Sequence, residues 1–329
     1  MLLSPVIHCH DRDLFSVAPM IDCTDRHFRY LARLISRKTM LYTEMLTIKE
    51  ILCDKTGYAL QLNAIEHPVG IQLGGSDPAL LAHCTQLAVQ EGYDEINLNV
   101  GCPSDKVQQG GIGACLMLQP KTVAACIEAM VKIATVPVTV KCRLGVDDHD
   151  SYEHLAEFIK VVSAQGCSKF IIHARKAWLK GLSPKQNREI PPLDYERAYR
   201  LKTDFPHLTI VLNGGIQHFD EVDSHLVRVD GVMLGRAIYN NPYMLHQVDS
   251  RYFGGDVGIS EEAVVLAYMN YVENELVRGT KLTAMTRHLV KLFHKKPKAS
   301  YWRKYLGSNG SQKGAGVEII QQALEQMQG

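Results

Sequence analysis

The chain has 329 residues, a formal net charge of +1 and a hydrophobic content of 46%, which together describe an ordinary globular protein with room for one large α/β domain and an appendage. Its nine cysteines are odd in number and include no C-x-x-C pair, so we expect neither a disulfide framework nor a metal site. The opening segment "MLLSPVIHCHDRD" lacks the charged region and apolar core of a signal peptide, and no later run could span a bilayer. We therefore expect a cytoplasmic protein with no metal and no membrane segment.

Eight short apolar or β-branched runs in the first three quarters of the chain predict strands. In chain order they are "LFSVAPM", "MLYTEML", "HPVGIQLGG", "YDEINLNVGC", "PVTVKCRLG", "KFIIHAR", "LTIVLNGG" and "DGVMLGRAI". Between them, helical patterning is clearest at 77–91, 121–134, 152–165 and 194–201. Strands that alternate with helices in this way over about 230 residues favour a (β/α)8 barrel, the TIM barrel, over a doubly wound sheet.

Polar or reactive residues stand at the ends of these runs. In chain order they are Pro19-Met20, Glu44, Gln72, Asn99 with Cys102, Lys141 with Arg143, His173 with Arg175, Asn213-Gly214-Gly215 and Gly235-Arg236. In a (β/α)8 barrel the carboxyl ends of the strands converge on one mouth, where the active site is built. A single residue of this kind has an ordinary structural explanation, but eight successive strand ends predict an enzyme.

The seventh and eighth runs end in glycine, in "LNGGI" and "MLGRAI". Glycine lets backbone N–H groups approach an anion and Arg236 adds a cation, so these two ends predict a phosphate site. The G-x-G-x-x-G and P-loop signatures are absent, which favours a mononucleotide-like cofactor over a dinucleotide. FMN fits, with Gln72 and Lys141 at its polar ring edge. For Lys141 the alternative is a Schiff-base lysine, as in aldolases.

Basic residues are concentrated in two segments that contain no acidic residue. Arg278 to Lys313 holds ten Lys or Arg, and Lys169 to Arg188 holds six. Such segments can be solvated helix faces, but two of them in a nearly neutral protein favour a polyanionic partner such as RNA or DNA.

Helical patterning at 261–278, 283–293 and 317–327 predicts a helical C-terminal part. Within it, Tyr301, Trp302 and Tyr305 stand among basic residues in "HKKPKASYWRKYL". Aromatics in that setting either stack on nucleic-acid bases or simply pack in a helical cap.

Six blocks of the chain resemble the flavin-dependent tRNA-dihydrouridine synthases, closest to their DusA type. The blocks are "SVAPMIDCTDRHFR", "NLNVGCPSDKVQQGGIGACLM", "VKCRLGVDDHDSYE", "FIIHARKAWLKGLSPKQNREIPPLDY", "LNGGI" and "DGVMLGRAIYNNPY", and they run in order from Phe15 to Tyr243. The resemblance implies an FMN-binding catalytic TIM barrel at 1–245 and a helical tRNA-binding domain at 246–329. It also implies NADPH-driven reduction of the C5=C6 bond of D-loop uridines 20 and 20a to dihydrouridine.

The resemblance also implies roles for individual residues. Cys102 would be the general acid, because a thiol is mostly protonated at neutral pH and could protonate C5 once hydride has reached C6. Asn99 would face the uracil. The FMN-binding residues would be Ala18, Pro19, Met20, Gln72, Lys141, His173, Asn213, Gly214, Gly215, Gly235 and Arg236. Residues that meet the tRNA would include Lys176, Lys180, Lys185, Arg188 and Arg303.

Three other functions compete with this interpretation. An FMN-dependent reductase of a free pyrimidine, similar to dihydroorotate or dihydropyrimidine dehydrogenase, would have no use for the basic C-terminal segment. A Schiff-base aldolase would need Lys141 but no flavin. A non-catalytic RNA-binding module would leave Cys102 and the strand ends unexplained. No separate NADPH domain is visible, so we expect NADPH and tRNA to use one face in turn, and we expect a monomer.

Overall fold

The computed structural model describes residues 11–328, which fall into two compact units. The barrel unit comprises residues 11–21 and 40–235, and the helical unit comprises residues 22–39 and 236–328. The helical unit therefore takes in a segment near the N-terminus as well as the C-terminal part that the sequence predicts. Residues 1–10, which include Cys9 and most of the segment used to argue against a signal peptide, lie outside the described residues.

Eight parallel strands form the sheet of the barrel unit, as the sequence predicts. They are β1 (Phe15–Val17), β2 (Leu41–Thr47), β3 (Val69–Gly74), β4 (Glu95–Val100), β5 (Val138–Arg143), β6 (Lys169–His173), β7 (Thr209–Asn213) and β8 (Gly231–Leu234). The sheet runs from β2 through β3 and onward to β8, which pairs with β1. A parallel bridge between Ser16 and Met40 brings β1 back beside the start of β2, where Val17 N–H donates to the Met40 carbonyl at 2.9 Å. The expected (β/α)8 barrel is confirmed.

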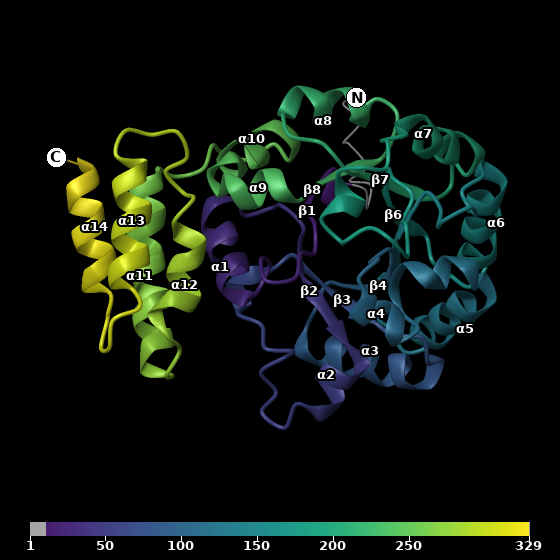
Figure 1. Ribbon diagram of the computed structural model, residues 1–329, viewed down its shortest axis with the longest axis horizontal. Helices are drawn as coiled ribbons and strands as arrows, with labels where there is room; N and C mark the ends of the chain where they lie inside the picture. Colours follow the sequence, from purple (N-terminus) through teal and green to yellow (C-terminus); the bar gives the residue numbers. More distant parts are fainter. Residues whose placement is uncertain (1–10, 329) are drawn as a thin grey trace, which may run out of the picture. The chain divides into compact units, whose positions relative to one another are not determined.

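Helices follow the strands and cover the outside of the barrel (Figure 1). They are α2 (Ile48–Cys53), α3 (Pro78–Glu91), α4 (Asp105–Gln109), α5 (Pro120–Val131), α6 (Tyr152–Ser163), α7 (Tyr195–Asp204) and α8 (Phe219–Leu226). Local sequence sets where they begin: the Asp77 carboxylate accepts from Leu80 N–H ahead of α3, and Ser151 caps α6 through His154 N–H. The four predicted barrel helices are confirmed to within a few residues.

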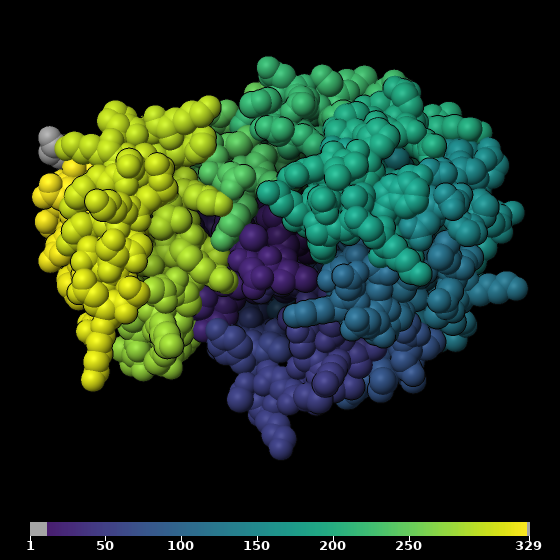
Figure 2. All heavy atoms as spheres, in the orientation of Figure 1, coloured from purple at the N-terminus to yellow at the C-terminus, as the bar shows by residue number. Residues whose placement is uncertain are grey.

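The interior of the barrel is apolar on one side and polar on the other. An apolar cluster joins Ala18, Met40, Tyr42, Ile171, Val211 and Met233. Toward β3, β4 and β5 the buried side chains are polar instead, with Gln72, Asn97 and Thr139 almost inaccessible. Buried polar groups are favourable only when they are hydrogen-bonded. The polar side chains on this side of the barrel therefore require a network of hydrogen bonds. Figure 2 shows a hollow on the visible face, bordered in part by blue and teal atoms from the middle of the chain.

The helical unit contains seven α-helices. They are α1 (Arg26–Ile35), α9 (Arg236–Asn240), α10 (Val248–Tyr252), α11 (Glu261–Val277), α12 (Leu282–Leu289), α13 (Ala299–Asn309) and α14 (Glu318–Gln328). The sequence predicts α11, α12 and α14, but it did not single out α13 as a helix. Trp302 lies on α13, is fully buried, packs edge-on against Phe293 and donates from Nε1 to the Leu289 carbonyl at 2.8 Å. Of the two roles considered for it, packing within the helices is the one observed.

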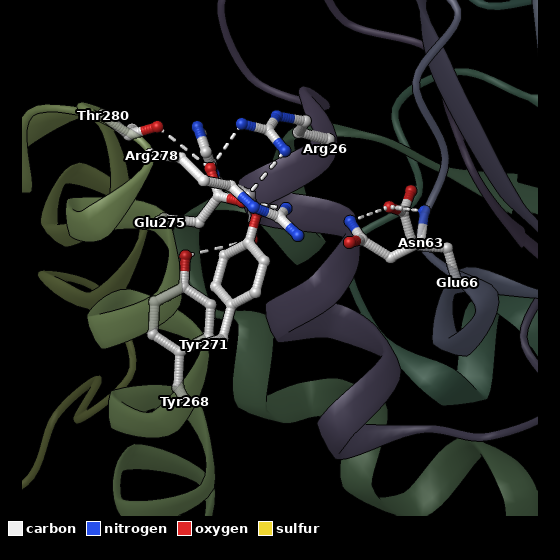
Figure 3. A network of polar contacts seen from close by, with 9 residues as sticks. Arg26, Asn63, Glu66, Tyr268, Tyr271, Glu275, Arg278 and Thr280 are labelled. Carbon is white, nitrogen blue, oxygen red and sulfur yellow. Dashed lines mark hydrogen bonds and ion pairs between the residues drawn. The ribbon is translucent and has the colours of Figure 1, made fainter.

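A buried ion pair joins α1 to α11 within the helical unit (Figure 3). Arg26 contacts both oxygens of the Glu275 carboxylate, with Nη1 to Oε1 at 3.1 Å, and the Thr280 hydroxyl donates to Oε2 at 2.9 Å. Burial opposes ionisation, but Thr280 and Arg26 together lower the pKa of Glu275. Tyr30 of α1 also stacks on Tyr271 of α11, with ring centroids 3.9 Å apart. Among residues 11–328, no helix is both long and apolar enough to cross a membrane.

Candidate active site

The loop after β4 holds Cys102 in a fixed backbone position. The N–H groups of Gly101 and Cys102 both donate to Asn99 Oδ1, at 3.1 and 2.9 Å. The Cys102 carbonyl accepts from Ala114 N–H at 2.8 Å, and a Cβ on Gly113 would come within 2.5 Å of that carbonyl oxygen. Glycine at 113 therefore allows the loop to fold back on itself. Cys102 is a free, partly exposed thiol, as a proton donor to a bound substrate would need to be.

Arg143, at the end of β5, ties this loop to the loop after β6. Its Nε donates to the Gly101 carbonyl at 2.9 Å, and its Nη1 donates to the carbonyls of Lys176 and Asn187, both at 3.0 Å. Burial first, and then the nearby Arg188 and Arg175, lower the pKa of Arg143 to about 10. The sequence places Arg143 at a strand end without assigning it a role. The structure gives it one, as the positioning group between the two loops.

Lys141 lies two residues before Arg143 and is held by Asn213 at the end of β7. Its Nζ donates to Asn213 Oδ1 at 3.0 Å, while Asn213 Nδ2 donates to the Met233 carbonyl at 2.8 Å. Burial and the charge of Arg143 lower the pKa of Lys141 to about 8. This lysine is therefore an oriented cation that loses its proton more easily than an ordinary lysine.

His173 ends β6 and is surrounded by cationic groups. Burial first, and then Arg143, Lys141, Arg175 and Arg188, lower its pKa well below the ordinary value, so His173 is neutral near pH 7. Cations gathered around a neutral imidazole are characteristic of an anion-binding site.

The glycines that end β7 and β8 lie close against the predicted site residues. A Cβ on Gly214, whose φ is +118°, would lie 2.6 Å from His173 Cδ2. A Cβ on Gly235 would lie 3.3 Å from Met20 Sδ and 3.4 Å from Ala18 Cβ. The structure therefore brings the ends of β1, β6, β7 and β8 together as predicted. Arg236 is exposed and begins α9 of the helical unit, and Pro19 is partly buried between Ala18 and Met20.

Gln72 and Asn99 lie side by side on β3 and β4. Asn99 Nδ2 donates to Gln72 Oε1 at 2.7 Å, and Gln72 Nε2 donates in turn to Asn97 Oδ1 at 2.9 Å. Both side chains are therefore fixed before any ligand arrives. Asn97 is not among the site residues predicted from the sequence, although the alternation of polar and apolar residues in "DEINLNVG" marks positions 95, 97 and 99 as one face of a strand.

The basic residues of the loop after β6 differ in their exposure to solvent. Lys176 forms an ion pair with Asp150 at 2.9 Å and lies over the Trp178 ring, with Nζ 4.2 Å from its centroid. Lys180, Lys185 and Arg188 are exposed. Lys176 is thus part of the loop's own structure, whereas the other three are accessible to a polyanion.

The basic segment of the helical unit is partly neutralised by acids from outside it. Among the residues described, Lys296 pairs with Glu261 at 3.2 Å and Arg278 with Glu275 at 3.0 Å. Arg303 is exposed, as predicted for a residue that meets RNA, and so are its neighbours Lys295 and Lys304. The count of ten basic residues therefore overstates the positive charge that this segment offers.

A barrel whose strand ends bring together a partly exposed thiol, an oriented lysine, and a group of cationic and glycine residues has the architecture of a (β/α)8-barrel enzyme. The chain belongs to the dihydrouridine synthase family, whose sequence model matches residues 16–328.

Relatives from three bacteria support this assignment. The chain is 54% identical to the tRNA-dihydrouridine(20/20a) synthase of Shewanella oneidensis over 95% of its own length and 94% of that protein. It is 55% identical to the protein of that name from Vibrio cholerae, over 94% of this chain and 95% of the relative, and 56% identical to that of Escherichia coli K12, over 94% and 90%. A 2-naphthoyl-CoA reductase structure in complex with 2-naphthoyl-CoA shares the fold, with a TM-score of 0.57 and 12% identity over 72% of this chain and 50% of that one.

Proposed function

We propose that this enzyme reduces the C5=C6 bond of uridines 20 and 20a in the D-loop of tRNA, with FMN as cofactor and NADPH as reductant. The relatives named for this activity match almost the whole chain. The observation that carries the chemical part of the proposal is the position of Cys102, whose backbone is fixed by Asn99 at the end of β4. The proposal also includes that the protein is cytoplasmic and monomeric. Its full-length similarity to tRNA-modifying relatives favours tRNA over a free pyrimidine as substrate.

The residues at the barrel mouth fit FMN in three respects. Gly214 leaves no room for a side chain and Gly235 leaves little, and both allow a flat or anionic group to approach the backbone. Lys141, held by Asn213, supplies a cation suited to the polar edge of the ring. The cationic group around His173 suits a phosphate. Ala18, Pro19, Met20, Gln72 and Gly215 would complete the site from neighbouring strand ends, and Arg236 would add a charge to the phosphate.

Bound FMN, once reduced by NADPH, would supply the hydride that adds to C6 of the uracil. The residues of this chain then have to complete the reduction. Hydride addition leaves an electron pair shared between C5 and O4, and the Cys102 thiol donates its proton to C5, which leaves a thiolate that solvent reprotonates. Asn99, fixed by Gln72, orients the uracil for this step.

The tRNA would be held by basic residues in each unit. In the barrel unit these are Lys180, Lys185 and Arg188 of the loop after β6, with Lys176 holding that loop through Asp150. In the helical unit Arg303 would contact phosphate. A uridine buried in a folded tRNA has to leave its stack to reach a barrel mouth, so contacts with the flanking backbone are expected to carry much of the affinity.

Replacing Cys102 by Ala tests the chemical step. Loss of one general acid typically lowers a rate by about 10²–10⁴-fold, so dihydrouridine formation should fall by that factor in a single-turnover assay with tRNA. FMN content and NADPH oxidation should persist because neither requires the thiol. Cys115→Ala is the matched control: Cys115 lies in the same region, donates from Sγ to the Ile112 carbonyl at 3.2 Å and should tolerate the change. A Cys102→Ala enzyme with the wild-type rate would rule out this residue as the proton donor.

A further inference from the structure

Three polar side chains on β4 point into the barrel, although such interiors are usually filled by apolar residues. Glu95, Asn97 and Asn99 occupy alternate positions of the strand and are 5%, 0% and 8% exposed. Strand register places Gln72 of β3 opposite Asn97 on one side and Thr139 of β5 opposite it on the other. So many buried polar groups destabilise the fold unless they form hydrogen bonds with one another.

These side chains form one continuous line of hydrogen bonds that ends at the Cys102 loop. Thr139 Oγ1 donates to Glu95 Oε1 at 2.6 Å, and Asn97 Nδ2 donates to Thr139 Oγ1 at 2.8 Å. Gln72 Nε2 donates to Asn97 Oδ1 at 2.9 Å, and Asn99 Nδ2 donates to Gln72 Oε1 at 2.7 Å. Asn99 Oδ1 then receives the N–H groups of Gly101 and Cys102. We refer to this line, from Glu95 to Asn99, as the barrel chain.

An ion pair fixes the far end of the barrel chain. Glu95 Oε2 lies 2.8 Å from Lys169 Nζ, and the Tyr42 hydroxyl donates to Glu95 Oε1 at 2.7 Å. Lys169 also contacts Asp13. Burial alone would lower the pKa of Lys169, but Glu95, Tyr42 and Asp13 raise it well above the ordinary value, so the lysine stays charged. Both oxygens of the Glu95 carboxylate therefore accept hydrogen bonds, Oε1 from Tyr42 and Thr139 and Oε2 from Lys169.

The direction of every hydrogen bond in the barrel chain follows from that carboxylate. Thr139 has one proton and gives it to Glu95, so it can only accept from Asn97. Asn97 must therefore turn its oxygen to Gln72, and Gln72 must turn its oxygen to Asn99. Asn99 is left with its oxygen toward the two backbone N–H groups. Reversal of any one amide would set two donors or two acceptors against each other at both of its ends.

We propose that Asn97 and Thr139 are positioning residues that transmit the orientation of the Glu95–Lys169 ion pair to Gln72, Asn99 and the Cys102 backbone. The inference rests on the proposed function, in which Cys102 is the proton donor. The barrel chain also determines which hydrogen-bonding groups the site offers to a ligand. Gln72 and Asn99 each keep one side-chain N–H that forms no hydrogen bond within the barrel chain. Both are thus donors, and the groups they recognise are acceptors, such as the carbonyl oxygens of a pyrimidine ring.

A purely structural role for the same bonds makes a different prediction. If the barrel chain only satisfies buried polar groups, breaking it should lower the stability of the whole unit without a specific effect at Gly101 and Cys102. If the barrel chain positions the loop, the amides of Gly101 and Cys102 should lose much more of their protection against hydrogen exchange than the amides in the rest of the barrel. Hydrogen exchange of individual amides separates the two cases.

The decisive variant is Thr139→Val, which removes the hydroxyl at nearly constant volume. Glu95 keeps Tyr42 and Lys169 as partners, while Asn97 loses the acceptor that orients it. The amides of Gly101 and Cys102 should then exchange about tenfold faster relative to Val107 N–H, which donates to the Ser104 carbonyl at 2.9 Å in the short helix α4 that follows. Single-turnover dihydrouridine formation should fall about tenfold to a hundredfold, as expected when a catalytic group is misplaced.

Two controls accompany the variant. Thr139→Ser keeps the hydroxyl and should restore both the exchange rates and the turnover. Thr85→Val makes the same change at another fully buried threonine, whose hydroxyl has no hydrogen-bond partner in the described part of the chain, and should alter neither. If Thr139→Val fails to fold, Thr139→Ala removes the hydroxyl without placing a second methyl group against Asn97 and gives the same readouts.

Unchanged relative exchange at Gly101 and Cys102 in a folded Thr139 variant would overturn the positioning role, and so would a Thr139→Ser enzyme as impaired as Thr139→Val. The exchange measurement needs neither tRNA nor turnover. A wild-type rate in Cys102→Ala would therefore remove the proposed proton donor while leaving the exchange result, and the positioning of the loop, intact.

Discussion

An alanine at position 214 should disturb the barrel mouth through two separable effects. The first is backbone strain, because Gly214 has a φ of +118°, a region that residues with a Cβ rarely adopt. The second is steric, because the new Cβ would lie 2.6 Å from His173 Cδ2 and 3.0 Å from His173 Nε2. His173 is buried, and its ring would have to shift to make room.

The two effects can be given approximate sizes. A residue held in a sparsely populated backbone region costs about 1–3 kcal/mol. Displacing a side chain by roughly 30° from its rotamer costs about 0.5–1.5 kcal/mol. Gly214→Ala should therefore destabilise the barrel unit by roughly 1.5–4.5 kcal/mol. Because His173 belongs to the proposed FMN site, FMN affinity should fall about tenfold as well, equivalent to about 1.4 kcal/mol.

Gly181→Ala provides the matched comparison. Gly181 has a φ of +81° but a Cβ there would have no neighbour within 4 Å, so this variant carries the strain without the collision. Urea unfolding gives the free energy of unfolding of both variants, and titration of the apo proteins with FMN gives the affinities. Gly181→Ala should lose stability and keep FMN affinity. Equal FMN affinities in the two variants would refute the contact between position 214 and His173 as a determinant of cofactor binding.

Two further predictions concern charge. Binding an anion favours the protonated form of Lys141, whose pKa is lowered to about 8, so FMN affinity should fall as the pH rises from about 7 to about 9, and Lys141→Gln should flatten this dependence. Replacing Lys295, Arg303 and Lys304 by Gln should weaken tRNA binding and reduce the log–log salt slope by about 2, at roughly 0.7 per phosphate contact, with FMN binding unaffected.

Each of these predictions has its own contradicting outcome. Without ligand, the stability of the folded protein depends on pH in the opposite direction to FMN affinity. The charged form of Lys141 lowers the stability below a pH of about 8, and this loss is relieved as the pH rises. An FMN affinity that did not change across this range would exclude Lys141 as a contact of the anion. For the RNA prediction, the control replaces three exposed lysines of the barrel helices. These are Lys121, Lys132 and Lys160. Equal losses of tRNA affinity in both triple variants would indicate a general charge effect.

The arrangement of the strands could be predicted because eight short, mainly apolar runs alternate with helical segments, and nearly every run is followed by a polar or reactive residue, a pattern that depends only on the barrel architecture. The same pattern selected Cys102, Lys141 and Asn213 as candidate site residues, since a residue at or just after a strand end lies at the mouth whatever surrounds it. Asn97 and Thr139 were missed because they lie in mid-strand, where their function depends on the strands that happen to be adjacent. That information is in the register of β3, β4 and β5 and cannot be read from one strand alone.

The helical unit was predicted less completely for a related reason. Its second segment, residues 22–39, is distant in sequence from residues 236–328, and Arg26 finds its partner Glu275 only in the folded unit. The acid-free interval from Arg278 to Lys313 was a correct observation, but the carboxylates that neutralise part of it come from outside the interval. Helix α13 was not recognised because its basic and aromatic residues suggested contacts with RNA, whereas Trp302 and Leu306 on it are buried.

The burial of Trp302 gives the protein two natural optical probes in different surroundings. The sequence contains two tryptophans, and one lies in each unit. Trp302 is sealed in an apolar environment, whereas Trp178 is partly exposed beneath the Lys176 ammonium group. Their fluorescence spectra should therefore differ, with Trp302 emitting at the shorter wavelengths. Changes in the two bands make it possible to ask which unit responds first to heat, urea or RNA without attaching any dye.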